Sequence, residues 1–182
     1  MRVLLFATVF ALPGCSDYFS KTKDPKAVGE AVGAYAITAQ ADPASTCIEI
    51  VNAAPRPWNF SVSLRRDGTR AYWFSGPEPI EGTLDDKTGT LSFKTTTRTL
   101  VHDVDKKREL GACVIVRVDE FVGTLSADKK ALTGTLRYGY QLEAGSDCRD
   151  AVGPVLPERP SPLFTTMPCA ALFAVTAAKT DG

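Results

Sequence analysis

Apolar and polar residues alternate along the chain from residue 33 onward, and this pattern constrains the fold more than any other feature. In the segment 88–101, Leu91 and Phe93 fall on one face, whereas Lys94 falls on the other. The same alternation, rich in β-branched and aromatic residues, runs through the segments 58–66, 113–126 and 131–143. Such a period of two is typical of antiparallel strands with one buried face. It predicts an all-β fold.

Short polar turns separate the alternating segments. Asp67-Gly68 is a dipeptide that favours a tight hairpin turn, and longer polar turns lie at 85–89 and 127–130. The predicted strands are 33–40, 47–53, 58–66, 69–75, 79–85, 90–101, 113–126, 131–143 and 170–178. Consecutive strands joined by short turns form a single antiparallel meander. A meander of about eight strands can close into a barrel, which leaves no exposed edge, and a β-sandwich is the alternative.

The N-terminus has the features of a secretory signal peptide. Met1-Arg2 is a short positive segment, and the apolar run 3–11 is about half the roughly 20 residues that a membrane-spanning helix needs. The next residues, Leu12-Pro13-Gly14-Cys15, resemble the lipobox of bacterial lipoproteins, in which a small residue directly precedes the Cys. In that family the Cys receives acyl chains, palmitate among them, and the chain is cut before it. Two or more acyl chains anchor a protein stably to a membrane.

This resemblance implies a division of the chain into three parts. Residues 1–14 are the expected signal peptide, and residues 15–32 are the expected lipidated Cys and its tether. Residues 33–182 form the expected β-domain, which contains a Pro-rich loop at 153–168. Ser16, rather than Asp, follows the Cys, and in this family that choice favours the outer membrane. The sequence leaves open which face of that membrane carries the domain.

The remaining cysteines support export to an oxidising compartment. Without Cys15 an even number remains, namely Cys47, Cys113, Cys148 and Cys169. Such a set in an exported chain predicts disulfides. Of the three possible pairings we favour Cys148–Cys169, which would close the Pro-rich loop, together with Cys47–Cys113 across the strands. A zinc site is the rival interpretation, but no C-x-x-C pair supports it, so no metal is expected.

Charge and motifs point away from nucleic acid and from catalysis. The chain has 21 basic and 21 acidic residues, so its net charge gives no electrostatic reason to bind nucleic acid. It contains none of the G-x-S-x-G, H-E-x-x-H, P-loop or G-x-G-x-x-G motifs. The single histidine, His102, is interpreted as a solvated loop residue. We therefore expect no catalytic residues, no cofactor and no enzymatic activity.

The segment 113–126 illustrates how a strand's two faces are assigned. One face carries three valines, Val114, Val116 and Val118. The adjacent carboxylates of Asp119 and Glu120 are interpreted as solvated groups, because a hydrolytic carboxylate pair would have to converge across strands.

Aromatic residues are the candidates for a binding site. Tyr72, Trp73 and Phe74 place rings on both faces of one predicted strand, and Tyr138 and Tyr140 flank a glycine in another. Core packing is the ordinary interpretation of such rings. A ligand cavity or a surface for a protein partner is the alternative.

The domain resembles lipocalin-like barrels across residues 33–178. Lipocalins carry G-x-W on their first strand, and here Gly33-Ala34-Tyr35 has Tyr in place of Trp. The resemblance implies a barrel that holds a small hydrophobic ligand. Two functions therefore remain open. The first is a non-enzymatic interaction or assembly module of the cell envelope, with a protein partner and a filled interior. The second is a carrier of a small hydrophobic ligand, with an internal cavity.

Overall fold

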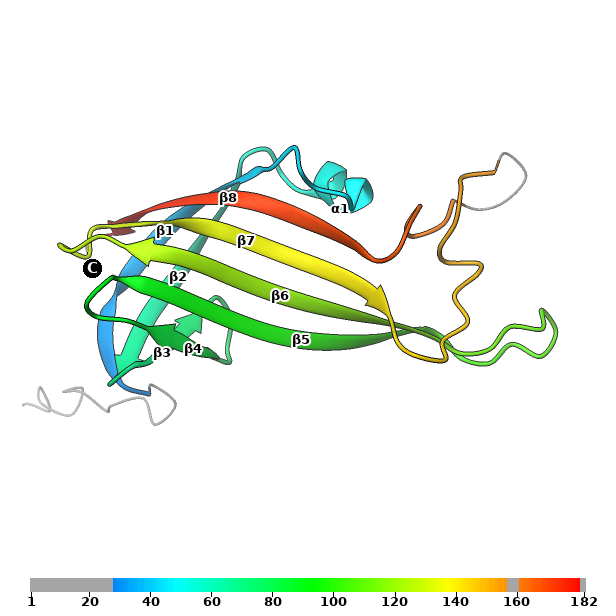
Figure 1. Ribbon diagram of the computed structural model, residues 1–182, viewed down its shortest axis with the longest axis horizontal. Coiled ribbons are helices and arrows are strands. Elements are labelled where there is room, and N and C mark those ends of the chain that lie inside the picture. Colours follow the sequence, from blue (N-terminus) through cyan, green and yellow to red (C-terminus); the bar gives the residue numbers. More distant parts are fainter. Residues whose placement is uncertain (1–27, 157–160, 181–182) are drawn as a thin grey trace, which may run out of the picture.

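The computed structural model describes residues 28–156 and 161–180. Its eight strands form one closed barrel, in which each strand is antiparallel to the next and β8 pairs with β1 (Figure 1). The elements are β1 (Glu30–Ala41), α1 (Ile48–Ala53), β2 (Trp58–Asp67), β3 (Arg70–Phe74), β4 (Ile80–Leu84), β5 (Thr90–His102), β6 (Cys113–Leu125), β7 (Ala131–Leu142) and β8 (Cys169–Thr180). The predicted all-β, lipocalin-like barrel is confirmed, and the β-sandwich alternative is wrong.

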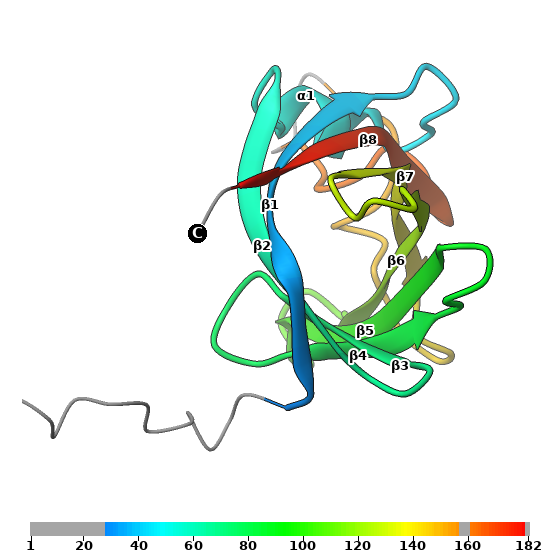
Figure 2. The same cartoon turned by 90° about the vertical axis from the view of Figure 1, so that its left-hand side faces the viewer.

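The two ends of the barrel differ. One end, which we call the turn end, carries the short connections β2–β3, β4–β5 and β6–β7. The opposite end, the loop end, carries three long connections at 42–57, 103–112 and 143–168 (Figure 1). Helix α1 belongs to the first of these and lies at the loop end. Figure 2 looks at the barrel from the turn end, with β1 and β2 on one side and β5 and β6 on the other.

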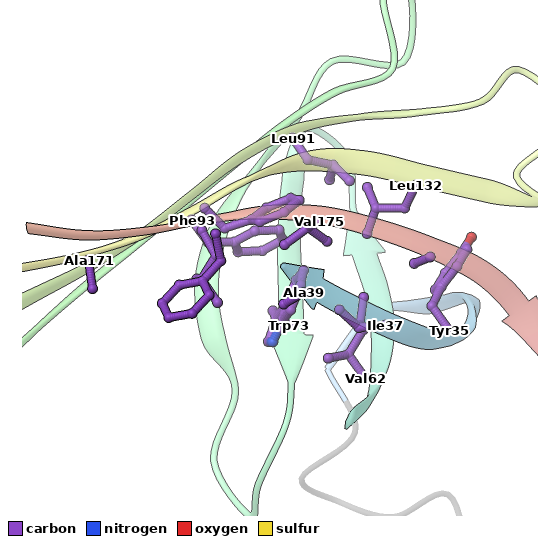
Figure 3. Packing of buried hydrophobic residues seen from close by; sticks show 14 of the residues in the cluster. Tyr35, Ile37, Ala39, Val62, Trp73, Leu91, Phe93, Leu132, Ala171 and Val175 are labelled. Atoms are coloured by element: carbon purple, nitrogen blue, oxygen red, sulfur yellow. The ribbon is translucent and has the colours of Figure 1, made fainter. Parts of the chain in front are cut away.

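Strand alternation directs a layer of side chains, three of them aliphatic, into the barrel near the turn end. Ile37, Val62, Leu132 and Tyr35 are buried there, each with at most 2% of its surface exposed (Figure 3). The Tyr35 hydroxyl donates a hydrogen bond of 2.9 Å to the carbonyl oxygen of Lys129, in the β6–β7 turn. This bond links β1 to the β6–β7 turn across the intervening strand β8. Side chains therefore fill this half of the interior.

Glycines make room for two phenyl rings in the middle of the barrel. A Cβ atom on Gly82 would lie 2.4 Å from the ring of Phe93, and one on Gly123 would lie 2.5 Å from the ring of Phe121. On the neighbouring strand, a Cβ atom on Gly134 would lie 2.7 Å from that same Phe121 ring. Real Cβ contacts are not this short, so the rings can lie flat against the sheet only because these side chains are missing. The two rings separate the filled half of the barrel from the loop end.

Helix α1 occupies part of the segment 47–53, where the sequence predicted a strand, so that prediction is wrong. A run of six residues is too short for periodicity alone to separate helix from strand. The helix is instead fixed by its surroundings, because Ile50 and Val51 pack against the core and a disulfide holds Cys47. The β1 strand also starts at Glu30, before the predicted residue 33. A β-bulge between Ala31 and Gly33 interrupts the alternation there and hides the start of the strand.

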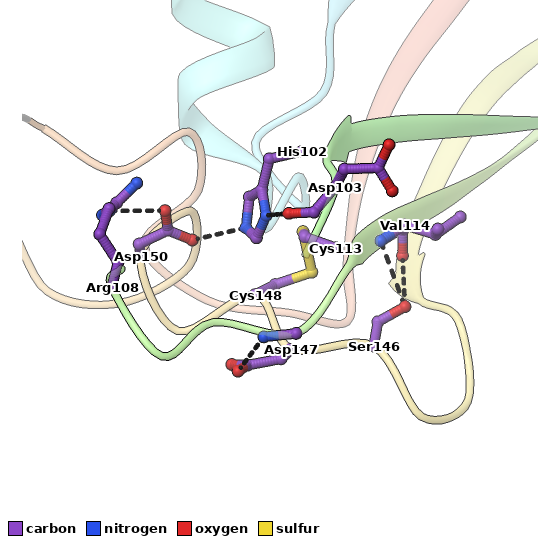
Figure 4. The surroundings of a disulfide bond; sticks show 10 residues. His102, Asp103, Arg108, Cys113, Val114, Ser146, Asp147, Cys148 and Asp150 are labelled. Carbon is purple, nitrogen blue, oxygen red and sulfur yellow. Dashed lines mark hydrogen bonds and ion pairs between the residues drawn. A yellow bond between two sulfur atoms is a disulfide. The ribbon is translucent and has the colours of Figure 1, made fainter. Parts of the chain in front are cut away.

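All four cysteines of the domain form disulfides, but the favoured pairing is wrong. The bonds are Cys47–Cys169 and Cys113–Cys148, and Figure 4 shows the second. Closure of the barrel explains the first, because the Cys47 amide donates to the carbonyl oxygen of Ala170 at the start of β8. The second joins the start of β6 to the connection that follows β7, its neighbour in the sheet. Both disulfides lie at the loop end.

Several sequence predictions lie outside the described residues. These are the signal peptide 1–14, the lipidated Cys15 and the tether as far as residue 27. Residues 157–160 of the Pro-rich loop are likewise not described. Within 28–156 and 161–180, none of the helices has the length and apolar character needed to cross a bilayer.

Candidate ligand-binding cavity

A cavity of about 790 Å³ occupies the loop-end half of the barrel. Its walls come from strands β2 to β8, and α1 and the residues that follow it also line the cavity. The volume lies within the range of roughly 300–1,000 Å³ that is typical of small-molecule sites. A carrier of a small ligand, the second function left open by the sequence, requires an internal cavity, and the barrel contains one.

Two clusters of aromatic rings form the apolar wall. In the first, the ring centroid of Trp58 lies 5.0 Å from that of Phe60 and 5.5 Å from that of Phe173. In the second, Trp73 lies 5.4 Å from Phe93 and also contacts the ring of Phe121. Tilted and edge-on pairs such as these each contribute about 0.5–1.5 kcal/mol beyond their buried area. The wall is therefore held in place by its own packing before any ligand enters.

One ion pair interrupts this wall. Arg117 and Asp119 are alternate residues of β6, so both side chains point into the barrel. Arg117 Nη2 donates to Asp119 Oδ2 at 2.8 Å, and the guanidinium carbon lies 5.6 Å from the ring centroid of Tyr138. Arg117 Nε lies 2.7 Å from Asp119 Oδ1, which is ion-pair distance, yet these two atoms are not aligned as a hydrogen bond. They are the only buried side-chain polar atoms of the described residues without a hydrogen-bond partner.

The strand register assembles further polar side chains around the ion pair. Arg117 lies between Thr97 of β5 and Tyr140 of β7, and Asp119 lies between Thr95 and Tyr138 in the next row. We call this two-row group the polar patch, and its six members are Thr95, Thr97, Arg117, Asp119, Tyr138 and Tyr140. Threonine and tyrosine hydroxyls both donate and accept hydrogen bonds. The patch therefore presents donors and acceptors along one side of an otherwise apolar cavity.

Burial raises the pKa of both tyrosines of the patch, which are uncharged at neutral pH. Desolvation raises the pKa of the Tyr138 hydroxyl strongly, and the Asp119 carboxylate raises it further. Desolvation also raises the pKa of Tyr140, although the nearby Arg117 charge opposes it. Burial disfavours the Arg117 charge as well, but the hydrogen bond and charge of Asp119 outweigh it, so the pKa of the guanidinium is raised. The patch thus holds one positive and one negative charge beside two uncharged phenols.

Three of the five aromatic candidates lie in the cavity. Trp73, Tyr138 and Tyr140 line it, whereas Tyr72 and Phe74 have the opposite phase of β3 and lie on the outside of the barrel. The prediction that rings occupy both faces of this strand is therefore confirmed. The five residues therefore do not all line the same cavity.

The ion pair was not predicted from the sequence, because the prediction for β6 considered the face that carries its valines. The inward face instead carries Cys113, Ile115, Arg117, Asp119 and Phe121. The interpretation of Asp119 as a solvated partner of Glu120 is therefore wrong. The two carboxylates lie on opposite faces, and Glu120 pairs outside the barrel with Lys94 and Arg137. Phe121 and Leu125, in phase with Arg117, were the signal that could have identified the inward face.

His102 lies outside the cavity and has a structural contact. It is the last residue of β5, and its Nε2 atom lies 3.0 Å from Asp150 Oδ1 (Figure 4). Arg108 pairs with the other oxygen of that carboxylate at 2.9 Å. With its side chain only 21% exposed, His102 is not the solvated loop residue that the sequence suggested. The three side chains join the loop 103–112 to the connection after β7, close to the Cys113–Cys148 disulfide.

No metal-binding cluster of three or more His, Cys, Asp or Glu side chains occurs among the residues that the structure describes. Comparisons of the chain with protein-family models, with curated proteins and with solved structures found no significant match. The class of the protein therefore follows from its own geometry. It is an all-β protein whose closed, lipocalin-like barrel contains a cavity lined by aromatic rings and a polar patch.

Proposed function

We propose that the protein is a non-enzymatic binding protein that holds one small, largely apolar molecule inside its barrel. The observation that carries the proposal is the cavity of about 790 Å³ with its aromatic wall. Burial of apolar surface contributes about 25 cal/mol per Å². A ligand that packs against this aromatic wall therefore gains affinity without any charged contact. The alternative of an assembly module with a filled interior fits this cavity poorly.

We also propose that binding takes place at the bacterial outer membrane. This part rests on the sequence, in which Leu12-Pro13-Gly14-Cys15 resembles a lipobox. Replacement of the anchor residue, Cys15→Ala, should abolish incorporation of labelled palmitate and leave an uncleaved precursor. Continued labelling of the Cys15→Ala chain would show that the lipobox interpretation is wrong.

A fluorescent apolar probe, N-phenyl-1-naphthylamine, tests the binding function directly. Both tryptophans of the chain, Trp58 and Trp73, line the cavity, so energy transfer from them reports a probe bound inside the barrel. The matched variants are Thr97→Phe and Thr96→Phe, which add the same ring to neighbouring residues of β5. Thr97 lines the cavity, whereas Thr96 points outward.

We expect Thr97→Phe to weaken probe binding at least about tenfold, or about 1.4 kcal/mol, because its ring occupies ligand volume. Thr96→Phe should bind the probe as the unmodified protein does. Equal affinities for both variants would place the probe outside the cavity and contradict the proposal. Native mass spectrometry of the protein purified from its own host should in addition reveal a co-purified small molecule.

A further inference from the structure

The Arg117–Asp119 ion pair is an unusual component of a ligand cavity. Asp119 is well buried, with 16% of its side chain exposed, whereas 41% of the Arg117 side chain is exposed. Because Arg117 lines the cavity, its exposed part is available to a molecule inside the barrel. The pair therefore lies where a ligand would contact it.

Stability alone does not account for the pair. Moving two charges out of water is costly, and a buried ion pair is often no more stabilising than apolar side chains of similar size. Here the cost is increased, because Arg117 Nε and Asp119 Oδ1 lack hydrogen bonds of good geometry. The part of the pair that a ligand can reach is the exposed portion of the Arg117 side chain at the cavity wall, together with the remaining accessible surface of Asp119.

The charges of the cavity balance. The charged residues among the described lining are Arg117, Asp119 and Glu120, and the Glu120 carboxylate pairs outside the barrel with Lys94 at 2.7 Å and Arg137 at 3.0 Å. Asp119 therefore neutralises Arg117 within the cavity. A ligand carboxylate or ammonium group would add an uncompensated charge to this apolar site, which is unfavourable.

We infer that the ligand has an apolar body and one uncharged polar group that hydrogen-bonds to the Arg117–Asp119 pair, as a primary amide or an alcohol would. This inference rests on the proposed binding function. An amide oxygen accepts from the guanidinium, and an amide N–H or a hydroxyl donates to the carboxylate. Tyr138 and Tyr140, which flank the pair in the register, supply further hydroxyls. The apolar body lies against the aromatic wall.

Four compounds with the same ten-carbon chain test the inference: decanamide, decan-1-ol, decanoate and decylammonium. Each is titrated against bound N-phenyl-1-naphthylamine at neutral pH. We expect decanamide and decan-1-ol to bind the unmodified protein at least about tenfold more tightly than either ion. Preference for decanoate or decylammonium, or equal affinity for all four, would overturn the inference.

Variants of the pair make the test independent of chain length and hydrophobicity. Asp119→Asn leaves the Arg117 charge unbalanced, so the preference should shift to decanoate. Arg117→Gln leaves the Asp119 charge, so the preference should shift to decylammonium. The double variant with both substitutions is neutral and should again prefer the uncharged compounds. If the ranking stays the same in every folded variant, the pair does not select the polar group.

The outcomes separate the two proposals. If neither the probe nor any ten-carbon compound binds the unmodified protein, the proposed binding function itself fails. If all bind inside the barrel but the ranking ignores charge, the binding function stands and the inference about the polar group is wrong. Should a single variant fail to fold, the ranking measured on the unmodified protein still decides the inference.

Discussion

The two disulfides close chain loops of very different length, and this difference predicts their relative contributions to stability. Cys47–Cys169 joins residues 122 apart, and Cys113–Cys148 joins residues 35 apart. The entropy lost by a closed unfolded loop gives about 4.9 kcal/mol for the first bond and about 3.8 kcal/mol for the second at 25 °C. The shorter loop lies inside the longer one. With the shorter bond intact, the longer one closes a path of about 87 residues and contributes about 4.6 kcal/mol.

Equilibrium urea unfolding of two double variants measures these contributions. We expect Cys47→Ala with Cys169→Ala to lower the free energy of unfolding by about 4–5 kcal/mol, and Cys113→Ala with Cys148→Ala to lower it by about 3–4 kcal/mol. All four cysteines are buried, so both variants remove the same atoms from similar surroundings and their difference reports the loops. The fully reduced, unmodified protein is the control for the change to alanine. A larger loss from the shorter loop would refute the entropic reasoning.

Three further predictions concern the core, the loop end and a close contact between strands. Leu91→Ala removes a fully buried side chain and should lower the free energy of unfolding by about 2–5 kcal/mol in urea; a loss under about 1 kcal/mol would contradict the packing described. The Asp103 carbonyl and the Asp150 carboxylate raise the pKa of His102 above its ordinary 6.5 against the effect of burial. Their stabilising effect is therefore complete below about pH 6.5 and disappears as the pH rises through the folded pKa. NMR titration of this single histidine should show the raised pKa, and Asp150→Asn should lower it; an unchanged value in the variant would exclude the contact. Gly134→Ala should destabilise the barrel by at least about 1 kcal/mol, because its Cβ atom would lie 2.5 Å from a backbone oxygen, and an unchanged urea midpoint would contradict this.

The strands were predictable because their signal is local. The predicted strand 90–101 and the observed β5, Thr90–His102, agree almost residue for residue. In a strand the side-chain direction alternates with every residue, so a few neighbours are enough to reveal burial. The helix α1 lacked such a signal. Its six residues are positioned by the disulfide of Cys47 and by packing at the loop end, and both depend on the closed barrel.

The disulfide pairing was not predictable for the same physical reason. The bond Cys47–Cys169 follows from the pairing of β1 with β8, the contact that closes the barrel. A sequence argument that joined Cys148 to Cys169 considered only the loop between them. Closure of the barrel depends on the whole sheet, and no short segment of the sequence indicates it strongly. The number of disulfides could be derived from composition, whereas their connectivity required the topology.

The polar patch was missed because it reverses the usual rule for the face of a strand. In β6 the sequence groups three valines on one face, and Asp119 is interpreted as a solvated group. The register shows the opposite, because Phe121 and the two charged residues share the inward phase. Sequence rules that hold across a protein fail most often where function requires a costly arrangement. The reversal occurs in the loop-end half of the barrel, beside the cavity. The same rule held for Leu91, which is fully buried and does not line the cavity. The failed prediction and the cavity therefore coincide, because the two charged side chains that break the rule are both residues of the cavity wall.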